Sequence, residues 1–142
     1  MSIRNRLRAL GFGLGLAIGI ATALPVAAHG IEETVKPNFE RAITNLPGKS
    51  LVAVEVEYPP GAASRPHVHA KSAFIYAYVV SGAIESQVND GPKRVYRAGE
   101  SFFEEPGATH AVSRNASKTR PAKLLAVFVV DADDTALTTP IH

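Results

Sequence analysis

The segment SLVAVEVEY, residues 50–58, alternates apolar and polar side chains, and this alternation restricts the fold more than any other feature of the chain. Val52, Val54 and Val56 occupy every second position, and glutamates fill two of the positions that follow them. Side chains two residues apart point to the same face of a strand, whereas a helix needs apolar residues three and four apart. The segment therefore predicts a β-strand with one buried and one solvated face.

Further short apolar runs follow, and residues that favour turns separate them. The run FIYAYVV, residues 74–80, ends at Ser81-Gly82, and the next run, AIESQV, ends at the turn sequence Asn-Asp-Gly, so the two runs predict a hairpin. Additional strands are expected within residues 93–107, 110–115 and 122–130. This spacing is typical of an all-β sandwich or barrel.

The two ends of this region are less regular in sequence. Residues 31–43 could hold a helical turn, although Pro37 interrupts it. The polar tail, residues 131–142, is expected to be loosely held.

Residues 1–28 have the order of a secretory signal peptide. Three arginines precede the apolar stretch Ala9–Leu24, and small residues lead from there to Ala28. The apolar stretch is shorter than the roughly 20 residues of a membrane-spanning helix, and four glycines interrupt it. We therefore expect cleavage near Ala28 and a secreted or periplasmic product without a stable membrane anchor.

Cleavage at that point changes the charge balance of the chain. It removes three of the fifteen basic residues and none of the thirteen acidic ones, so the product carries a net charge of −1. This balance gives no reason to expect nucleic acid as a partner. The chain has no cysteine, which excludes disulfides and thiol catalysis. Its length suits one domain with a single modest core.

Two motifs in this chain resemble those of the cupin superfamily. The first motif has two histidines one residue apart between two glycines: Gly61, His67, His69 and Gly82. The second has a glycine, a Pro-Gly turn, a histidine and an asparagine: Gly99, Pro106, Gly107, His110 and Asn115. The resemblance implies a small antiparallel jelly-roll barrel, often dimeric, so we expect a homodimer. The expected division is a signal peptide, an N-terminal arm, a cupin barrel and a C-terminal tail, at residues 1–28, 29–47, 48–130 and 131–142.

The resemblance also implies that His67, His69 and His110 bind one divalent transition metal: Fe, Ni, Cu, Mn or Zn. The residues themselves agree with this reading, because histidines two apart in a strand enter the same side of a barrel. His110 follows a turn that returns the chain toward the same interior, and neutral imidazole is a good ligand for these metals. The alternative is a chance pair of surface histidines.

The carboxylate that usually completes such a site is missing from the first motif. Counting from either side, the family's glutamate should fall at Ala73, Phe74 or Ile75, and all three are apolar. In the second motif Glu105 stands where the family usually has proline, so the spacing there is open by one residue.

Three explanations compete for the missing carboxylate. The first, which we expect, is a neutral three-histidine site, as in some cupin-fold dioxygenases. The second is a ligand recruited from elsewhere in the chain, and its candidates are Glu104, Glu105, Tyr76, Tyr78 and Gln87. The third is the loss of the metal.

The function expected from these residues is a dioxygenase-type enzyme. A divalent metal held only by neutral imidazoles keeps its full charge and favours a small anionic or enolisable substrate. Apolar walls are expected from Phe74, Ile75, Phe102, Phe103 and Val112, although these residues fit an ordinary core equally well. Arg65 could hold a substrate carboxylate at the mouth. The sequence identifies no catalytic residue, and the alternative is a non-catalytic module that binds a small molecule or a metal.

Overall fold

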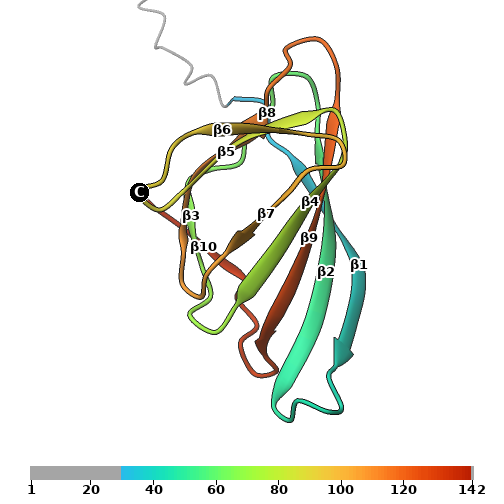
Figure 1. Cartoon of the computed structure of the whole chain (residues 1–142), viewed down its shortest axis with the longest axis vertical. Helices are drawn as coiled ribbons and strands as arrows, with labels where there is room; N and C mark the ends of the chain where they lie inside the picture. The colour runs from blue at the N-terminus through green and yellow to red at the C-terminus, as the bar shows by residue number, and fades with distance from the viewer. Residues whose placement is uncertain (1–29, 142) are drawn as a thin grey trace, which may run out of the picture.

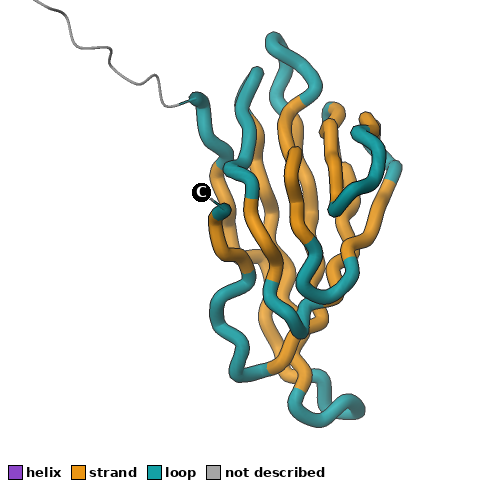
Figure 2. The backbone as a smooth tube through the Cα atoms, turned by 90° about the vertical axis from the view of Figure 1, so that its left-hand side faces the viewer, coloured by secondary structure: helices purple, strands orange, loops and turns teal. Residues whose placement is uncertain are grey.

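The computed structural model describes residues 30–141, which form ten strands and no helix. The predicted signal peptide and its predicted cleavage near Ala28 lie outside these residues. Nothing in the described part of the chain is a helix long and apolar enough to cross a membrane. The strands form two five-stranded antiparallel sheets that face each other, as Figures 1 and 2 show. The expected all-β jelly-roll class is thus confirmed.

Apart from the pairs β1–β2 and β5–β6, consecutive strands belong to different sheets, so each sheet collects segments that are distant in sequence. The first sheet has the order β1 (Thr34–Ala42), β2 (Lys49–Tyr58), β9 (Ala122–Asp131), β4 (Phe74–Ser81) and β7 (Ser101–Glu104). The second has the order β10 (Thr138–Pro140), β3 (His67–His69), β8 (Thr109–Asn115), β5 (Ala83–Val88) and β6 (Arg94–Arg97).

The core lies between the two sheets and is built mainly on the first. Strands β2 and β9 pair without interruption from Lys49–Asp131 to Tyr58–Ala122. Every second residue of β9 is buried, which is the alternation expected of a strand with one face on the core. The sequence predicted this for β2, where Val54, Val56 and Tyr58 face inward.

Both ends of the described chain join the sheets. Residues 34–42 form the edge strand β1, paired with β2, instead of a helical turn in an N-terminal arm. An edge strand tolerates Pro37 because it needs no second partner for its backbone, and the pairing shifts register between Pro37 and Phe39. The tail is also more ordered than expected, since β10 pairs with β3 and places Thr138 opposite His69.

Candidate metal centre

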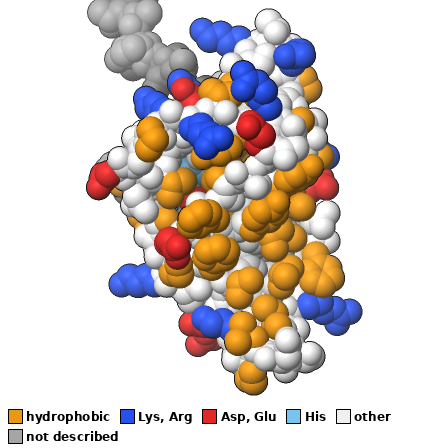
Figure 3. Space-filling view, in the orientation of Figure 1, with side chains coloured by type: hydrophobic (Ala, Val, Ile, Leu, Met, Phe, Trp, Pro, Cys, Tyr) orange, Lys and Arg blue, Asp and Glu red, His pale blue; other side chains and the backbone are white. Residues whose placement is uncertain are grey.

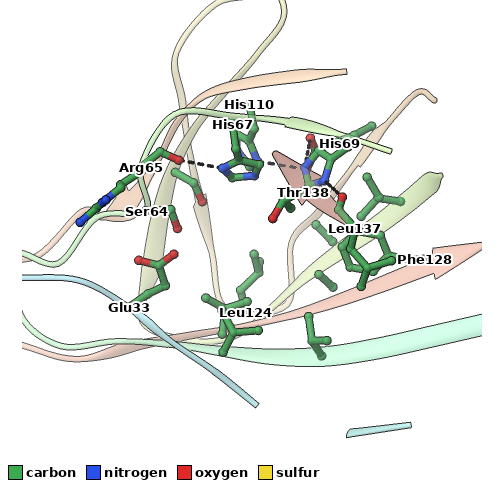
Figure 4. A pocket seen from close by; sticks show the side chains of 18 of the residues that line it. Glu33, Ser64, Arg65, His67, His69, His110, Leu124, Phe128, Leu137 and Thr138 are labelled. Atoms are coloured by element: carbon green, nitrogen blue, oxygen red, sulfur yellow. Dashed lines mark hydrogen bonds and ion pairs between the residues drawn. The ribbon is translucent and has the colours of Figure 1, made fainter. Parts of the chain in front are cut away.

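Strand register brings the three predicted histidines together. His67 and His69 point to the same side of β3, and His67 lies directly opposite His110 on β8. The ring centroids are 4.7 Å apart for His67 and His69, and 5.3 Å apart for His67 and His110. One ring nitrogen from each histidine lies within 4.8 Å of the other two. Figure 4 shows the three rings clustered on one side of a cavity.

Each histidine has one ring nitrogen held from outside the cluster. The Nδ1 atom of His67 contacts the carbonyl oxygen of Arg65 at 2.8 Å, and that of His69 contacts the carbonyl oxygen of Leu137 at 3.4 Å. The Nε2 atom of His110 contacts the Ser86 hydroxyl at 2.8 Å. A carbonyl oxygen only accepts, so the Nδ1 atoms of His67 and His69 carry a hydrogen, and in the neutral rings that bind a metal the Nε2 atoms offer the lone pair. Such outer contacts orient metal-binding histidines.

Burial also favours the neutral form of His67. It lowers the pKa of this side chain, and the neighbouring His69 and His110 lower the pKa further, while the hydrogen bond to the Arg65 carbonyl opposes the shift. A neutral imidazole is the form that binds a metal.

The carboxylate of Glu104 contacts two of the three histidines. One of its oxygens is 3.0 Å from Nε2 of His69, and the other is 3.2 Å from Nδ1 of His110. Burial raises the pKa of Glu104, but in the metal-free protein His110 and His69 outweigh it and lower the pKa to about 2 when the ring nitrogens that face the carboxylate carry a hydrogen. The carboxyl group is therefore ionised, and the expectation that only neutral side chains surround the site is not met.

Two buried polar atoms beside the histidines show whether the residues present fit a metal. Nε2 of His69 and Oε2 of Glu104 are shielded from solvent, and neither has a hydrogen-bond partner although they lie 3.0 Å apart. Buried polar atoms without partners are costly and rare in folded proteins. A cation that accepted a lone pair from each atom would remove this cost. The residues present therefore fit a divalent metal.

A cavity of about 660 Å³ opens beside the histidines. Its walls across from the rings are apolar and include Leu124 and Phe128 of β9, which face the histidines in Figure 4. Glu33 and Arg65 also line the cavity, at the left of Figure 4. A mostly apolar cavity with a few convergent polar groups is typical of small-molecule sites.

The sequence profile of the cupin domain matches residues 54–128, more than half of the chain, and these residues include all three histidines. The chain belongs to the cupin domain family. No curated protein matches its sequence.

Solved structures share this cupin fold at low sequence identity. A double-stranded β-helix protein from Klebsiella pneumoniae has a TM-score of 0.61 and 20% identity, covering 78% of this chain and 85% of its own. The cupin domain of Schizosaccharomyces pombe Cnp3 has a TM-score of 0.57 and 20% identity, covering 79% and 70%. An oxalate oxidase in complex with glycolate has a TM-score of 0.56 and 24% identity, covering 84% and 59%. At these identities the likeness shows the fold alone.

The cupin's predicted apolar walls are only partly correct. Ile75 lines the cavity, and Phe102 is buried with its ring 6.0 Å from that of His110. Phe74 and Phe103 were wrongly placed: they are 40% and 57% exposed and stack on each other on the outer face of the sheet. Successive side chains of a strand point to opposite faces, so the neighbours of inward-facing Ile75 and Phe102 must point outward.

The remaining predicted wall residue, Val112, does not line the cavity. The pairing of β8 with β5 shifts register between Val88, opposite His110, and Gln87, opposite Val112. Such a bulge reverses which side chains face inward, and Ser113 lines the cavity in place of Val112. No feature of the sequence marks this bulge.

Arg65 lies at the mouth as expected, but its guanidinium group is paired with Glu32, at 2.6 Å. Among the five alternative ligand candidates, only Glu104 lines the cavity. The others are Glu105, Tyr76, Tyr78 and Gln87. Alternation could have singled out Glu104, since it shares a strand face with Phe102.

Proposed function

We propose that this cupin is a metal-dependent enzyme of the dioxygenase type, acting on a small anionic or enolisable substrate. The convergence of His67, His69 and His110 on one end of the cavity carries this proposal. The cavity volume of about 660 Å³ suits a small molecule, and its apolar walls would exclude water from a bound substrate. A transition metal held by the histidines would supply a positive centre for substrate oxygen atoms and a redox partner.

A second polar group in the same cavity could orient the substrate. The Tyr58 hydroxyl contacts the hydroxyls of Ser64 and Ser113, each at 2.8 Å, and all three residues line the cavity. Burial raises the pKa of Tyr58, so its phenol keeps its proton and can donate a hydrogen bond. We infer that this hydroxyl cluster binds the polar end of the substrate that is not bound at the histidines.

The test is metal-dependent oxygen consumption. The purified protein is loaded separately with Fe²⁺, Ni²⁺, Cu²⁺ and Mn²⁺, and oxygen uptake is followed with small carboxylates, enols and phenols. Glycolate and oxalate belong in this panel because an oxalate oxidase of the same fold binds glycolate. The proposal expects uptake with at least one metal and none in His69→Ala. If panel compounds bind but no loaded form consumes oxygen, the non-catalytic binding module is the correct reading.

We also propose that the protein is exported after cleavage near Ala28. The order of charged, apolar and small residues in residues 1–28 supports this proposal. Mass analysis of the N-terminus of the secreted fraction tests it. An integral membrane protein that retains residues 1–28 would contradict it.

We propose that two copies pair through the outer face of β4 and β7. Phe74, Tyr76 and Phe103 are 40%, 44% and 57% exposed there, and Figure 3 shows hydrophobic side chains gathered over this part of the surface. Contiguous exposed apolar side chains are typical of interaction surfaces. Light scattering should give twice the chain mass at micromolar concentrations, and Phe103→Lys should give the monomer mass. A monomeric wild-type protein would reject this pairing.

A further inference from the structure

Ile75 is one of the three positions where the first cupin motif could have carried its glutamate, and it has a direct neighbour across the sheet. Ile75 of β4 pairs in register with Glu104 of β7, and both side chains are buried, with exposures of 1% and 3%. Residues directly opposite each other point to the same face of a sheet. We propose that Glu104 is the fourth protein ligand of the metal, so that β7 supplies the carboxylate that β4 lacks.

Glu104 lies on the side of the histidines that would face a metal, and this position supports its role as a ligand. A carboxylate that only orients a metal-binding histidine contacts the ring nitrogen that faces away from the metal. Here the outward nitrogens of His67, His69 and His110 are already taken by Arg65, Leu137 and Ser86. Glu104 instead contacts the other nitrogens of His69 and His110, which are the ones free to bind a metal.

The distances agree with ligands that share one ion. Nitrogen and oxygen ligands lie about 2.1 Å from a divalent metal, so two ligands at right angles are about 3.0 Å apart. The carboxylate oxygens of Glu104 are 3.0 Å from Nε2 of His69 and 3.2 Å from Nδ1 of His110. The pair of His69 and Glu104 has this separation without forming a hydrogen bond, and a metal between the two atoms would satisfy both.

An anionic ligand changes what the site can bind. One carboxylate reduces the charge of a divalent centre from +2 to +1. A monoanionic substrate bound at this centre would then bring its net charge to zero. Oxygen ligands also shift selectivity toward metals that accept them readily, such as Mn²⁺ and Fe²⁺. This inference rests on the proposed metal site and specifies its ligand set.

The first experiment compares two adjacent glutamates. Glu104→Gln keeps the shape of the side chain and removes its charge, and Glu105→Gln makes the same change at an exposed residue that does not line the cavity. Mn²⁺ and Zn²⁺ affinities are measured by titration calorimetry. Loss of a residue that only supports a ligand weakens binding roughly 10- to 100-fold. We therefore expect Glu104→Gln to weaken Mn²⁺ binding about 100-fold or more and Glu105→Gln to leave it unchanged.

The second experiment moves the carboxylate across the sheet. The double variant Ile75→Glu with Glu104→Ile exchanges the two paired residues and moves the carboxylate to one of the positions expected for the family's glutamate. It should recover most of the Mn²⁺ affinity that Glu104→Ile alone loses. Thermal unfolding of the metal-free variants identifies any that fail to fold.

A measurement on the wild-type protein does not depend on the folding of variants. Infrared difference spectra on adding Zn²⁺ to protein labelled with ¹³C-glutamate should show the carboxylate bands of one glutamate shifting. If the wild-type protein binds metal while Glu104→Gln keeps its affinity within twofold, or if no glutamate band shifts, Glu104 is not a ligand. If the wild-type protein binds no metal at all, the proposed metal site itself is wrong.

Discussion

Replacing Asn115 with alanine should destabilise the protein by about 3 kcal/mol. Its Nδ2 atom donates to the carbonyl oxygens of Tyr58, Pro59 and Arg120, at 3.2, 3.1 and 2.8 Å, and its Oδ1 atom accepts from the backbone N–H of Ser117 at 2.8 Å. Two amide hydrogens are shared among three carbonyls, so about three full hydrogen bonds are lost. Each contributes about 1 kcal/mol net, and buried groups left unpaired add to the cost.

Thermal unfolding followed by circular dichroism measures this effect. For a domain of this size, about 3 kcal/mol corresponds to a melting temperature lower by roughly 10–15 °C. Asn115→Asp should be at least as destabilising, because it places a carboxylate against three carbonyl oxygens. Asn38→Ala is the control, since its one side-chain contact, at 3.4 Å to Glu55, is exposed. A melting temperature for Asn115→Ala within about 3 °C of the wild type would refute the reasoning.

Three further changes have defined outcomes. Ser86→Ala removes the outer contact of His110 and should weaken Zn²⁺ binding about 10-fold in calorimetry, without loss of fold. Gly82→Ala should lower the melting temperature much more than Gly48→Ala: both glycines have positive φ, but only at Gly82 would the new Cβ meet backbone, 2.7 Å from the Pro121 carbonyl oxygen. The lowered pKa of Glu104 stabilises the metal-free protein above pH 4.5, its ordinary pKa, and this contribution, up to about 3 kcal/mol, is lost as the pH falls toward about 2. Urea unfolding between pH 5 and pH 3 should show roughly half of this loss in the wild type and none of it in Glu104→Gln.

The pair of His67 and His69 could be predicted from local sequence, whereas His110 was assigned from the turn that precedes it and from the resemblance to the second cupin motif. The spacing of His67 and His69 places both rings on one strand face, and this holds whatever the strand pairs with. The same alternation could also have predicted the cavity walls: if Ile75 faces inward, its neighbour Phe74 must face outward and cannot line the cavity. The error at Phe74 and Phe103 came from reading hydrophobicity without assigning a face to each residue.

Alternation along β7 predicts that Glu104 faces inward, but its position beside His69 and His110 depends on information that one strand does not contain. Its neighbourhood is set by the pairing of β7 with β4, and the two strands are separated by two others in the chain. Pairing register follows from turns and from packing of the whole sheet. Strand β1 could not be predicted from its own sequence for the same reason, because residues 34–42 are exposed and form a strand through pairing with β2.

Metal stoichiometry tests the account most directly. The purified protein, stripped with a chelator and reloaded with Mn²⁺ or Zn²⁺, is analysed by elemental mass spectrometry. The wild type should retain one ion per chain, and each of His67→Ala, His69→Ala and His110→Ala should retain much less at a free metal concentration that just saturates the wild type, because each variant loses one ligand of the site. Retention of one ion per chain by His110→Ala, or of none by the wild type, would contradict a metal centre built on these three histidines.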